Sequence, residues 1–401
     1  MRPWLSVIGV GDDGVSGLPP AAKALVDAAE IVVGAERLLA GLVPEGRELH
    51  VWSSPLSQTI ARIAGWRGRA VAVLASGDPM HFGVGCTLLR HIPLEEMRVV
   101  PAPSAFALAA ARLGWPLQEV ECLSLHGRPA ALIAPLIAPG ARILALTGGA
   151  GTVCEVADLL RRRGYGKSRL HVLEHMGGAA ERSVALSAEE VSGQPFAEFN
   201  LLAIECVAGP EAVLLPRVPG LPDEAFRHDG QITKREVRAV TLAALGPLPG
   251  ALLWDVGAGC GSVAVEWMRA ARGARATAFE RDQNRVSLIG ENARSLGVPD
   301  LEIVAGKVPE TLQGRAHPDV LFHGGAVADE AVFEACWSAL PQGGRLVANS
   351  VTLEGEAALI ARQGRYGGDL VRIDIAPLAP VGGKRGLKPR MSVMQWRAVK
   401  G

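Results

Sequence analysis

The sequence predicts an α/β protein built from two domains, and three observations support this fold class. The chain has 401 residues, which is more than one hydrophobic core usually holds. Short apolar runs that suit buried strands alternate with helix-like stretches in both halves. Many of these runs end in a glycine-rich loop, and strands separated by helices in this way are typical of α/β domains.

Composition argues against several partner classes. Apolar residues make up 49% of the chain, charged residues 20%, and the formal net charge is zero, so bulk charge indicates neither a nucleic acid nor a membrane surface as partner. The longest apolar stretch, Pro129–Ala141, is too short and too rich in proline to span a bilayer. The six cysteines form no C-x-x-C pair, which suits reduced, buried thiols and gives no metal site. The N-terminal residues show no signal-peptide pattern, so we expect a cytoplasmic protein.

The segment Leu252–Ser262 carries the strongest motif. An apolar run ends at Asp255, glycines alternate with small residues at positions 257, 259 and 261, and the helix-like stretch Val263–Ala271 follows. Glycine allows a tight turn and a close approach of ligand to backbone, and the helix start offers free N–H groups to a nucleotide-like ligand. The next strand, Ala274–Phe279, ends at Glu280, about 20 residues on, where an acid can hold a ribose diol.

This stretch resembles motif I of the class I S-adenosylmethionine (SAM) methyltransferases. The resemblance implies a Rossmann-like C-terminal domain in which Glu280 binds the ribose and Val304–Val308 forms the loop beside the adenine. The SAM-binding residues implied for this half are Thr233, Asp255, Gly257, Gly259, Gly261, Glu280, Gly306 and Val308. Thr233 also reads as the N-cap of a helix over Lys234–Leu245, with Glu236 completing a capping box.

The first half carries an ordered set of loops: Gly9-Val10-Gly11, Gly77-Asp78-Pro79 with Phe82-Gly83, Pro101–Ala105, His126-Gly127-Arg128 and Glu181-Arg182. Together they resemble the tetrapyrrole methylases, the class III methyltransferases, whose domain has two α/β lobes with SAM in the cleft between them. Asp12-Asp13 departs from the family's usual Pro-Gly, and Ala102 stands where the family often has glycine. The SAM-binding residues implied here are Gly9, Gly11, Gly77, Asp78, His81, Ser104, Ala105 and Thr147.

The proline-rich segment 209–222 reads as a linker between domains at 1–208 and 223–401. The lead-in Gln231–Arg238 and the tail Gly383–Met391 resemble the decarboxylating partner methylase of cobalamin biosynthesis. The whole chain thus resembles the fused, decarboxylating precorrin methyltransferases. This implies one SAM per domain and a carboxylate-rich tetrapyrrole substrate of the precorrin-6 type. The first domain would methylate carbon 5. The second would methylate carbon 15 and remove the C12 acetate carboxyl to give precorrin-8. We also expect a homo-oligomer.

Methyl transfer to an electron-rich bridging carbon requires alignment rather than a protein nucleophile, and orientation can contribute about 7–11 kcal/mol. No metal is needed. Decarboxylation requires a proton donor, and His228 and His323 are the candidates. The substrate carboxylates call for arginines, for which we select Arg227, Arg385 and Arg390. The alternative for Lys384–Arg390 is a solvent-facing basic tail.

Two other functions remain as alternatives. Gly9–Gly14 spells the dinucleotide pattern G-x-G-x-x-G and would suit a nicotinamide-dependent oxidoreductase. A polar loop precedes the helix expected at Ala21–Ala29, however, so no helix N-terminus lies directly beneath the glycines. The second alternative is a SAM-binding scaffold without turnover.

Overall fold

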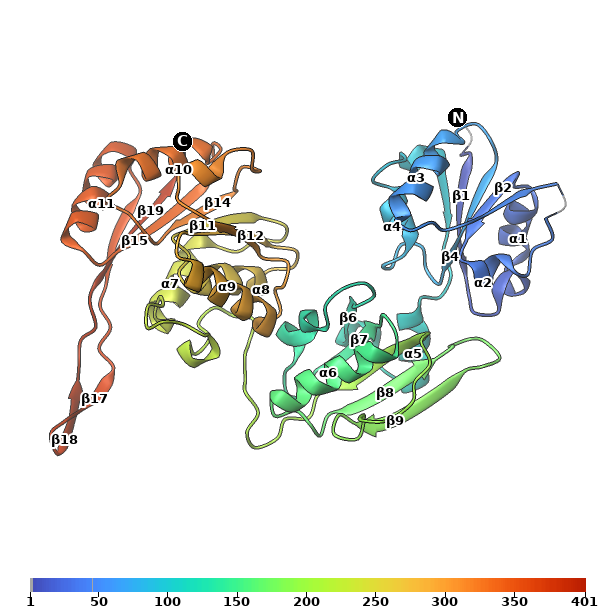
Figure 1. The fold of residues 1–401 in the computed structure, drawn as a ribbon, viewed down its shortest axis with the longest axis horizontal. Coiled ribbons are helices and arrows are strands. Elements are labelled where there is room, and N and C mark those ends of the chain that lie inside the picture. Colours follow the sequence, from blue (N-terminus) through green and yellow to red (C-terminus); the bar gives the residue numbers. More distant parts are fainter. Residues whose placement is uncertain (1–2, 45) are drawn as a thin grey trace. The chain divides into compact units, whose positions relative to one another are not determined.

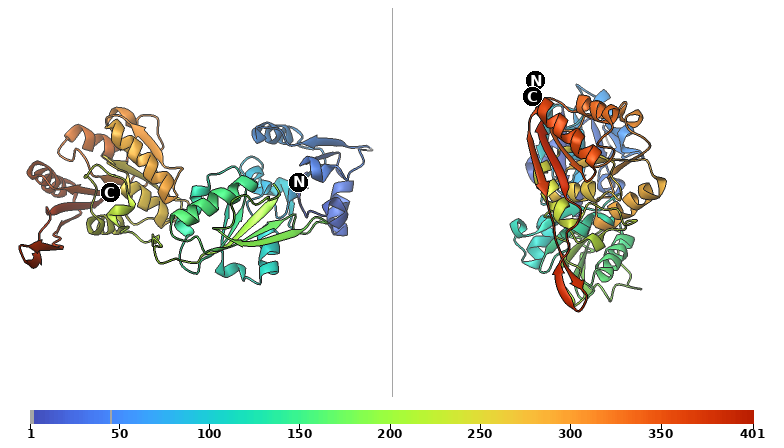
Figure 2. Two further views of the ribbon diagram at one scale, coloured as in Figure 1. Left: turned by 60° about the horizontal axis from the view of Figure 1, so that its bottom comes forward. Right: turned by 90° about the vertical axis from the view of Figure 1, so that its left-hand side faces the viewer.

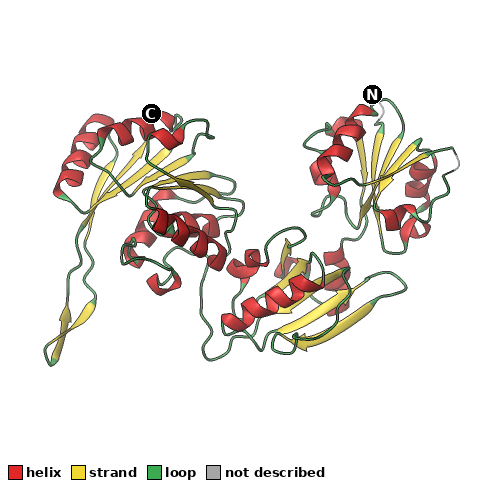
Figure 3. Cartoon of the chain, viewed as in Figure 1, coloured by secondary structure: helices red, strands yellow, loops and turns green. Residues whose placement is uncertain are grey.

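A computed structural model describes residues 3–44 and 46–401, and Met1, Arg2 and Glu45 lie outside the described residues. The chain forms two compact units, one of residues 1–130 with 139–213 and the other of residues 131–138 with 214–401 (Figure 1). Helices lie against both faces of the larger sheets, as Figure 3 shows by colour. Within the described ranges, no helix combines the length and the apolar character needed to cross a membrane.

The first lobe of unit 1 contains a five-stranded parallel sheet in the order β3-β2-β4-β1-β5. Its strands are β1 (Leu5–Val10), β2 (Ile31–Gly34), β3 (Glu48–Val51), β4 (Val71–Ser76) and β5 (Met97–Val100). Helices α1 (Pro20–Asp27) and α2 (Glu36–Leu39) pack on one face, and α3 (Leu56–Gly65) and α4 (Val84–Leu88) on the other. Because α1 begins only at Pro20, the helix N-terminus that a dinucleotide site requires is missing beneath Gly9–Gly14.

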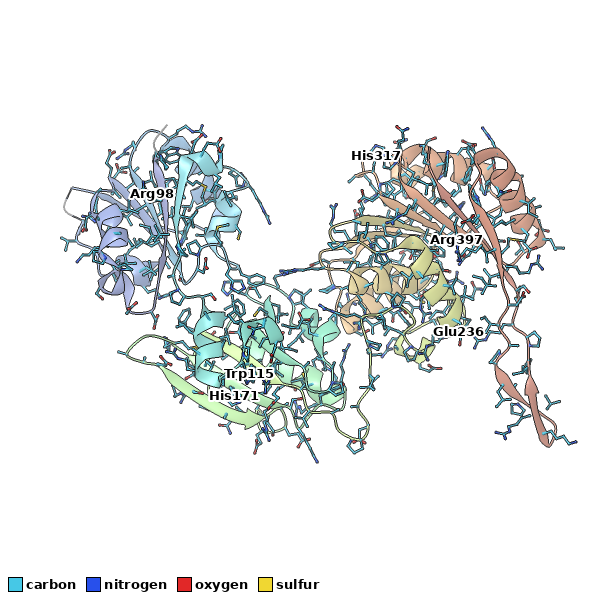
Figure 4. All side chains as sticks on the ribbon, turned by 180° about the vertical axis from the view of Figure 1, so that it is seen from behind. Arg98, Trp115, His171, Glu236, His317 and Arg397 are labelled. Carbon is cyan, nitrogen blue, oxygen red and sulfur yellow. The ribbon has the colours of Figure 1, made fainter. Side chains whose placement is uncertain are left out.

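The second lobe of unit 1 has a mixed sheet in the order β6-β7-β10-β8-β9. Its elements are β6 (Glu121–Ser124), β7 (Arg142–Leu146), β8 (Arg169–Glu174), β9 (Arg182–Ser187), β10 (Asn200–Glu205), α5 (Ala105–Leu113) and α6 (Ala150–Arg162). Phe106 and Ala109 of α5 pack with Trp115 against residues of β7 and β10. The edge of Trp115 also meets the ring of His171 on β8, with 6.3 Å between the ring centroids (Figure 4).

Unit 2 is organised around a seven-stranded sheet in the order β13-β12-β11-β14-β15-β19-β16. The strands are β11 (Leu252–Val256), β12 (Arg275–Glu280), β13 (Glu302–Ala305), β14 (Val320–His323), β15 (Arg345–Ser350), β16 (Asp369–Ile373) and β19 (Val393–Val399). Helices α7 (Arg235–Leu245), α8 (Ser262–Ala270) and α9 (Gln283–Leu296) cover one face. Helices α10 (Glu330–Ala339) and α11 (Leu353–Tyr366) cover the other. The sheet is parallel except at β19, which runs antiparallel to β15 and β16.

The remaining short elements lie in the connections. Strands β17 (Leu378–Val381) and β18 (Lys384–Leu387) form a hairpin that projects from the seven-stranded sheet of unit 2 (Figures 1 and 2). The short 3₁₀ helices are Gly14–Gly17, Leu94–Glu96, Leu117–Glu119, Ala130–Leu136, Asp223–Ala225 and Glu310–Leu312.

A buried ion pair ties the segment before α7 to the helix that follows the glycine motif. Arg238 is fully buried, and its Nε donates to Glu266 Oε1 at 2.6 Å. Glu266 also accepts the backbone N–H groups of Gly220 and Leu221, while the guanidinium of Arg238 donates to the carbonyl of Thr233. A buried pair of this kind needs such additional hydrogen bonds to offset its desolvation.

The expected capping box at the start of α7 is wrong. Lys234, not Thr233, occupies the N-cap position, and no side chain caps the helix. The carbonyl of Thr233 is held by Arg238 instead, so the geometry of this turn is set by a buried guanidinium.

Candidate functional site

The carboxyl edge of the unit 2 sheet opens into a cleft of about 1250 Å³. The loops after β13, β12, β11, β14 and β15 line it in that spatial order, followed by the start of β19 and the segment after β16. Residues 230–234, just before α7, also line the cleft. Six strand intervals of about 4.8 Å each give this edge a length of roughly 29 Å. The strand order therefore separates one end, at β11–β13, from another, at β15, β19 and β16.

Two glycine loops meet backbone to backbone in the middle of this edge. The N–H groups of Gly324 and Gly325 both point to the carbonyl of Val256, at 3.0 and 3.2 Å. Gly257 has φ of +75°, and a Cβ added there would lie 2.6 Å from the Cα of Gly325. Only glycine fits at this approach. Ala326, in the same loop, also has a positive φ of 54°, a strained conformation for a residue with a side chain.

Glu280 is fixed beside the first of these loops. Its Oε2 accepts the N–H of Gly259 at 2.8 Å, and its Oε1 accepts the N–H groups of Arg281 and Asp282. Glu280 lines the cleft, and because a carboxylate offers about four acceptor positions, Oε2 can accept a further hydrogen bond. A ribose diol donates hydrogen bonds, and the bare backbone of Gly257 and Gly259 leaves space beside it. The residues present therefore fit SAM.

Asp255 lies beneath the glycine loop rather than in the cleft. It is fully buried, its Oδ2 accepts the N–H of Ala264 at 3.0 Å, and its Oδ1 has no partner among the described residues. Burial raises the pKa of this carboxyl from 3.8 to about 7, and the charge of Glu280 adds to the rise. Asp255 thus braces the start of α8 from below.

His323 is the last residue of β14 and is also fully buried, on the side of α10 and α11. Burial lowers its pKa from 6.5 to about 4, and the positive charge of Arg362 lowers it further. Arg362 in turn donates to the carbonyl of Val327 at 2.5 Å, which holds the loop after β14 from behind. His323 is therefore a neutral residue beneath the cleft floor.

The structure brings together most of the SAM-binding residues expected in this half. Those that line the cleft are Thr233, Gly257, Gly259, Glu280, Gly306 and Val308. Gly261 does not line the cleft but ends the same loop as the N-cap of α8, with φ of +78°. A Cβ added at this position would lie 2.9 Å from Ile289.

The residues expected to act on the substrate are more scattered. Arg390 lines the cleft and pairs with Glu236 of α7 at 3.0 Å. His228 precedes the cleft-lining segment, and its Nδ1 accepts the N–H of Gly230. Arg227 is exposed and pairs with Glu291 at 3.3 Å. Arg385 is exposed on β18 of the projecting hairpin. None of these last three lines the cleft as described.

Apart from Arg390, sequence reasoning assigned no role to the residues at the far end of the cleft. Residues that line it there are Lys234, Val237, Asn349, Ser350, Thr352, Ile375, Met391 and Val393. Their positions follow from the antiparallel insertion of β19 between β15 and β16. The segment Gly344–Asn349 predicts a strand, and β15 confirms it over Arg345–Ser350. The position of Asn349 and Ser350 at the end of that strand was the available signal.

Unit 1 has a second close approach of backbones at the carboxyl edge of its parallel sheet. A Cβ added to Gly9 would lie 2.5 Å from the carbonyl oxygen of Gly77 and 2.7 Å from the nitrogen of Ala102. The loops after β1, β4 and β5 therefore touch, and Ala102 is accommodated because its neighbour is Gly9. Gly11 follows in the same loop, where a Cβ would meet the Asp13 carboxylate.

The other expected residues of unit 1 lie in two groups. His81 Nδ1 is 3.3 Å from the hydroxyl of Ser104, which caps α5 just before Ala105, and Asp78 accepts the N–H of Met80 in its own turn. Thr147 belongs to the second lobe, where its hydroxyl contacts Asn200 at 2.9 Å.

A contact between His175 and Asp12 links the two lobes of unit 1. His175, with φ of +48°, lies 3.7 Å from Asp12 of the loop after β1. Asp12 also pairs with Arg37 at 2.9 Å, so this acid, where the family usually has proline, takes part in joining the lobes.

Metal-ligating and thiol clusters do not contribute to either site as described. Within residues 3–44 and 46–401, no group of three or more His, Cys, Asp or Glu side chains is placed to hold a metal ion. The six cysteines are free thiols. The expectation that they are all buried is wrong, because Cys154 is exposed.

The glycine loop after β11, which we call a glycine cradle, and the acid that ends β12 are those of a class I SAM-dependent methyltransferase. The first unit has the two α/β lobes of a tetrapyrrole methylase. Residues 224–400 match the family model described as "Precorrin methyltransferase domain", and residues 5–192 match "Tetrapyrrole (Corrin/Porphyrin) Methylases".

Curated relatives from two organisms match the chain over nearly its full length. One from Sinorhizobium sp, named "Precorrin-6Y C(5,15)-methyltransferase [decarboxylating]", is 48% identical over 100% of this chain and 97% of its own. A relative of the same name from Mycobacterium tuberculosis is 39% identical over 98% of this chain and 99% of its own. A shorter relative from Pyrobaculum calidifontis, named "Probable cobalt-precorrin-6B C(15)-methyltransferase (decarboxylating)", is 38% identical over 38% of this chain and 80% of its own. The chain belongs to the family of decarboxylating precorrin methyltransferases.

Gly257 provides the first test of the SAM site. Replacing it by Ala places a Cβ against Gly325 and adds positive-φ strain of about 1–3 kcal/mol. We expect the affinity of unit 2 for SAM, measured by calorimetry, to fall at least about tenfold, which corresponds to 1.4 kcal/mol. Gly343→Ala is the matched control, since it has φ of +78° and no atom within 4 Å of the added Cβ. Equal SAM affinity in both variants would contradict the assignment of the SAM site to the Gly257 loop.

The buried Asp255 and His323 give opposite dependences of stability on pH. Between pH 3.8 and 7 the folded state alone keeps the Asp255 proton, so this residue lowers the unfolding free energy as pH rises. Between pH 4 and 6.5 the unfolded state alone keeps the His323 proton, so this residue raises it. Each slope is at most about 1.4 kcal/mol per pH unit.

In urea unfolding, Asp255→Asn should therefore gain stability relative to the unmodified protein as pH rises from 4 to 7. His323→Gln should lose stability relative to it between pH 4 and 6.5. These pKa shifts would be absent if the stability of both variants, relative to the unmodified protein, changed with pH in the same direction or did not change at all.

Proposed function

We propose that the two units divide the chemistry of the family between them, with one SAM bound in each. Unit 1 methylates carbon 5 of a precorrin-6-type macrocycle. Unit 2 methylates carbon 15 and removes the carboxyl of the C12 acetate, which gives precorrin-8. The observation that carries this proposal is the presence of two separate glycine cradles on parallel strands of two different sheets, at Gly9 and at Gly257. The shorter relative, named for the C15 step with decarboxylation, supports a unit that works alone.

The charge of the unit 2 cleft supports a substrate with many carboxylates. Among the described residues that line it, five carry positive charge and two carry negative charge: Lys234, Arg281, Arg285, Lys307 and Arg390 against Glu280 and Asp329. Arg390 lies at the end away from Glu280, and its partner Glu236 is itself about half exposed. A substrate carboxylate can therefore compete for Arg390, which we assign to substrate binding.

In the transfer step, SAM when bound supplies a methyl group from its sulfonium to the bridging carbon. The protein holds the macrocycle against that group and keeps water out. In the decarboxylation step, the bond between the acetate CH₂ and its carboxyl breaks and CO₂ leaves. The electron pair passes into the macrocycle, and the CH₂ carbon takes up a proton. His228 and His323 stay predictions as proton donors, and Arg227 and Arg385 as carboxylate-binding groups.

We also propose that the chain forms a homo-oligomer through the β17–β18 hairpin. Leu378 and Leu387 face each other across the hairpin, and their side chains are 61% and 70% exposed. A two-stranded hairpin that packs against nothing else is only marginally stable in water. The outer edges of its strands carry unpaired backbone N–H and C=O groups that can pair with another chain. A second copy of the same hairpin would cover both the apolar side chains and the edges.

Changing Leu378 and Leu387 together to Glu should reduce the oligomer to a 42.0 kDa monomer in light scattering, because the charges repel across the new contact. Leu353→Glu, at an 81% exposed position on α11, is the control and should leave the mass unchanged. A monomeric unmodified protein would contradict the proposal.

The division of chemistry is tested by the products that single-site variants form. Full-length Gly257→Ala with a precorrin-6-type substrate and SAM should add one methyl and retain the acetate carboxyl, as seen by mass spectrometry. In Gly9→Ala the added Cβ collides with the backbones of Gly77 and Ala102, and this variant should add one methyl and lose CO₂. Gly41→Ala is the control, because nothing lies within 4 Å of its added Cβ. The proposal fails if either variant loses both methylations.

A further inference from the structure

Three polar side chains lie together between the unit 2 sheet and α7. Thr241 of α7 and Gln395 of β19 are fully buried, and Asn349 of β15 is the residue paired directly with Gln395 across the two strands. Val347, two residues before Asn349 on the same face, belongs to the apolar core under α7–α9. Buried polar groups in such a place are costly unless their hydrogen bonds are satisfied.

The hydrogen bonds of this cluster fix the orientation of both amides. Arg397, on the α7 side of β19 (Figure 4), has only donors, and its Nε lies 2.7 Å from Gln395 Oε1. The amide nitrogen of Gln395 must then point the other way, to Asn349 Oδ1 at 2.9 Å and to Thr241 Oγ1 at 3.1 Å. Asn349 consequently directs its Nδ2 to Thr241 Oγ1, at 2.9 Å.

The Asn349 amide keeps hydrogen-bonding capacity for the cleft. A primary amide has two N–H donors and two acceptor lone pairs, and the cluster uses one of each. Asn349 lines the cleft at the end of β15, two strands from the Gly257 cradle. Ser350 and Thr352 line the cleft beside it, and Arg390 lies at the same end.

We propose that Asn349 contacts the tetrapyrrole in unit 2, with its second Nδ2–H donating to an acceptor atom of the substrate. Gln395 and Arg397 are positioning residues that set which end of that amide faces the ligand. The contact fixes the position of the macrocycle along the cleft and so selects which bridging carbon meets the methyl group. This inference rests on the proposed assignment of the precorrin site to unit 2.

The test uses the full-length protein with a precorrin-6-type substrate. Asn349→Asp keeps acceptors for Thr241 and Gln395 but removes the donor to the substrate, whereas Asn349→Ala removes both. We expect each to raise the KM for precorrin in the decarboxylating methylation at least tenfold. The Kd for SAM should stay within twofold of the unmodified protein, and C5 methylation should be unchanged. A variant that merely disturbs the fold would shift the SAM affinity as well.

The positioning residues give the second arm of the test. Gln395→Glu cannot donate to Asn349, so the Asn349 amide should turn its nitrogen toward Glu and the KM for precorrin should rise in the same way. Arg397→Met removes the anchor of Gln395 and should give a smaller rise. Arg372→Met, on the next strand and paired with Glu356 at 3.2 Å, is the matched control with no change expected.

Three results would overturn the inference. The first is an unchanged KM for precorrin in both Asn349 variants. The second is normal function of Asn349→Asp beside a defective Asn349→Ala, since the contact would then use the acceptor. The third is a parallel loss of SAM affinity in every variant. Failure of the unit assignment itself is recognised separately, because Gly257→Ala would then retain the decarboxylating methylation.

Discussion

The close approach of two backbones at the carboxyl edge of a parallel sheet is the constraint on which each unit depends. In unit 2, Gly257 lies against Gly325, and the carbonyl of Val256 accepts N–H groups from the loop after β14. In unit 1, Gly9 lies against Gly77 and Ala102. Side chains cannot occupy these contacts, so each loop presents backbone rather than side chains to a ligand placed there.

The two ends of the unit 2 cleft are supported in different ways. The cofactor end is held by backbone hydrogen bonds, with the buried Asp255 and the fixed Glu280 beneath and beside the glycine loop. The other end is held by side chains, through the buried amide of Gln395, the half-buried amide of Asn349, and the charged groups of Lys234 and Arg390. A binding surface made of backbone groups suits a ligand that a large class of enzymes shares. Side chains suit a substrate that differs from one enzyme to the next.

Much of this arrangement was open to prediction because its signals are local. The apolar run Leu5–Val10 predicts a buried strand and agrees with β1 at both ends. The glycine motif with its following acid located the cofactor end of the cleft. The segment after Tyr366 was not open to prediction. In β19, the buried Gln395 and the half-buried Arg397 interrupt the apolar pattern of a central strand, and the partner of Gln395 lies 46 residues away. The basic run Lys384–Arg390 gave no sign that its first part is a hairpin strand.

The central claim is that one chain holds two independent SAM sites. The most direct measurement is the number of SAM molecules bound per chain, by equilibrium dialysis with labelled SAM, in the unmodified protein and in the double variant Gly9→Ala/Gly257→Ala. The account predicts two molecules for the unmodified protein and none for the double variant at the same SAM concentration. A single molecule bound per unmodified chain would contradict it, because both cradles would then belong to one site or one of them would hold no cofactor.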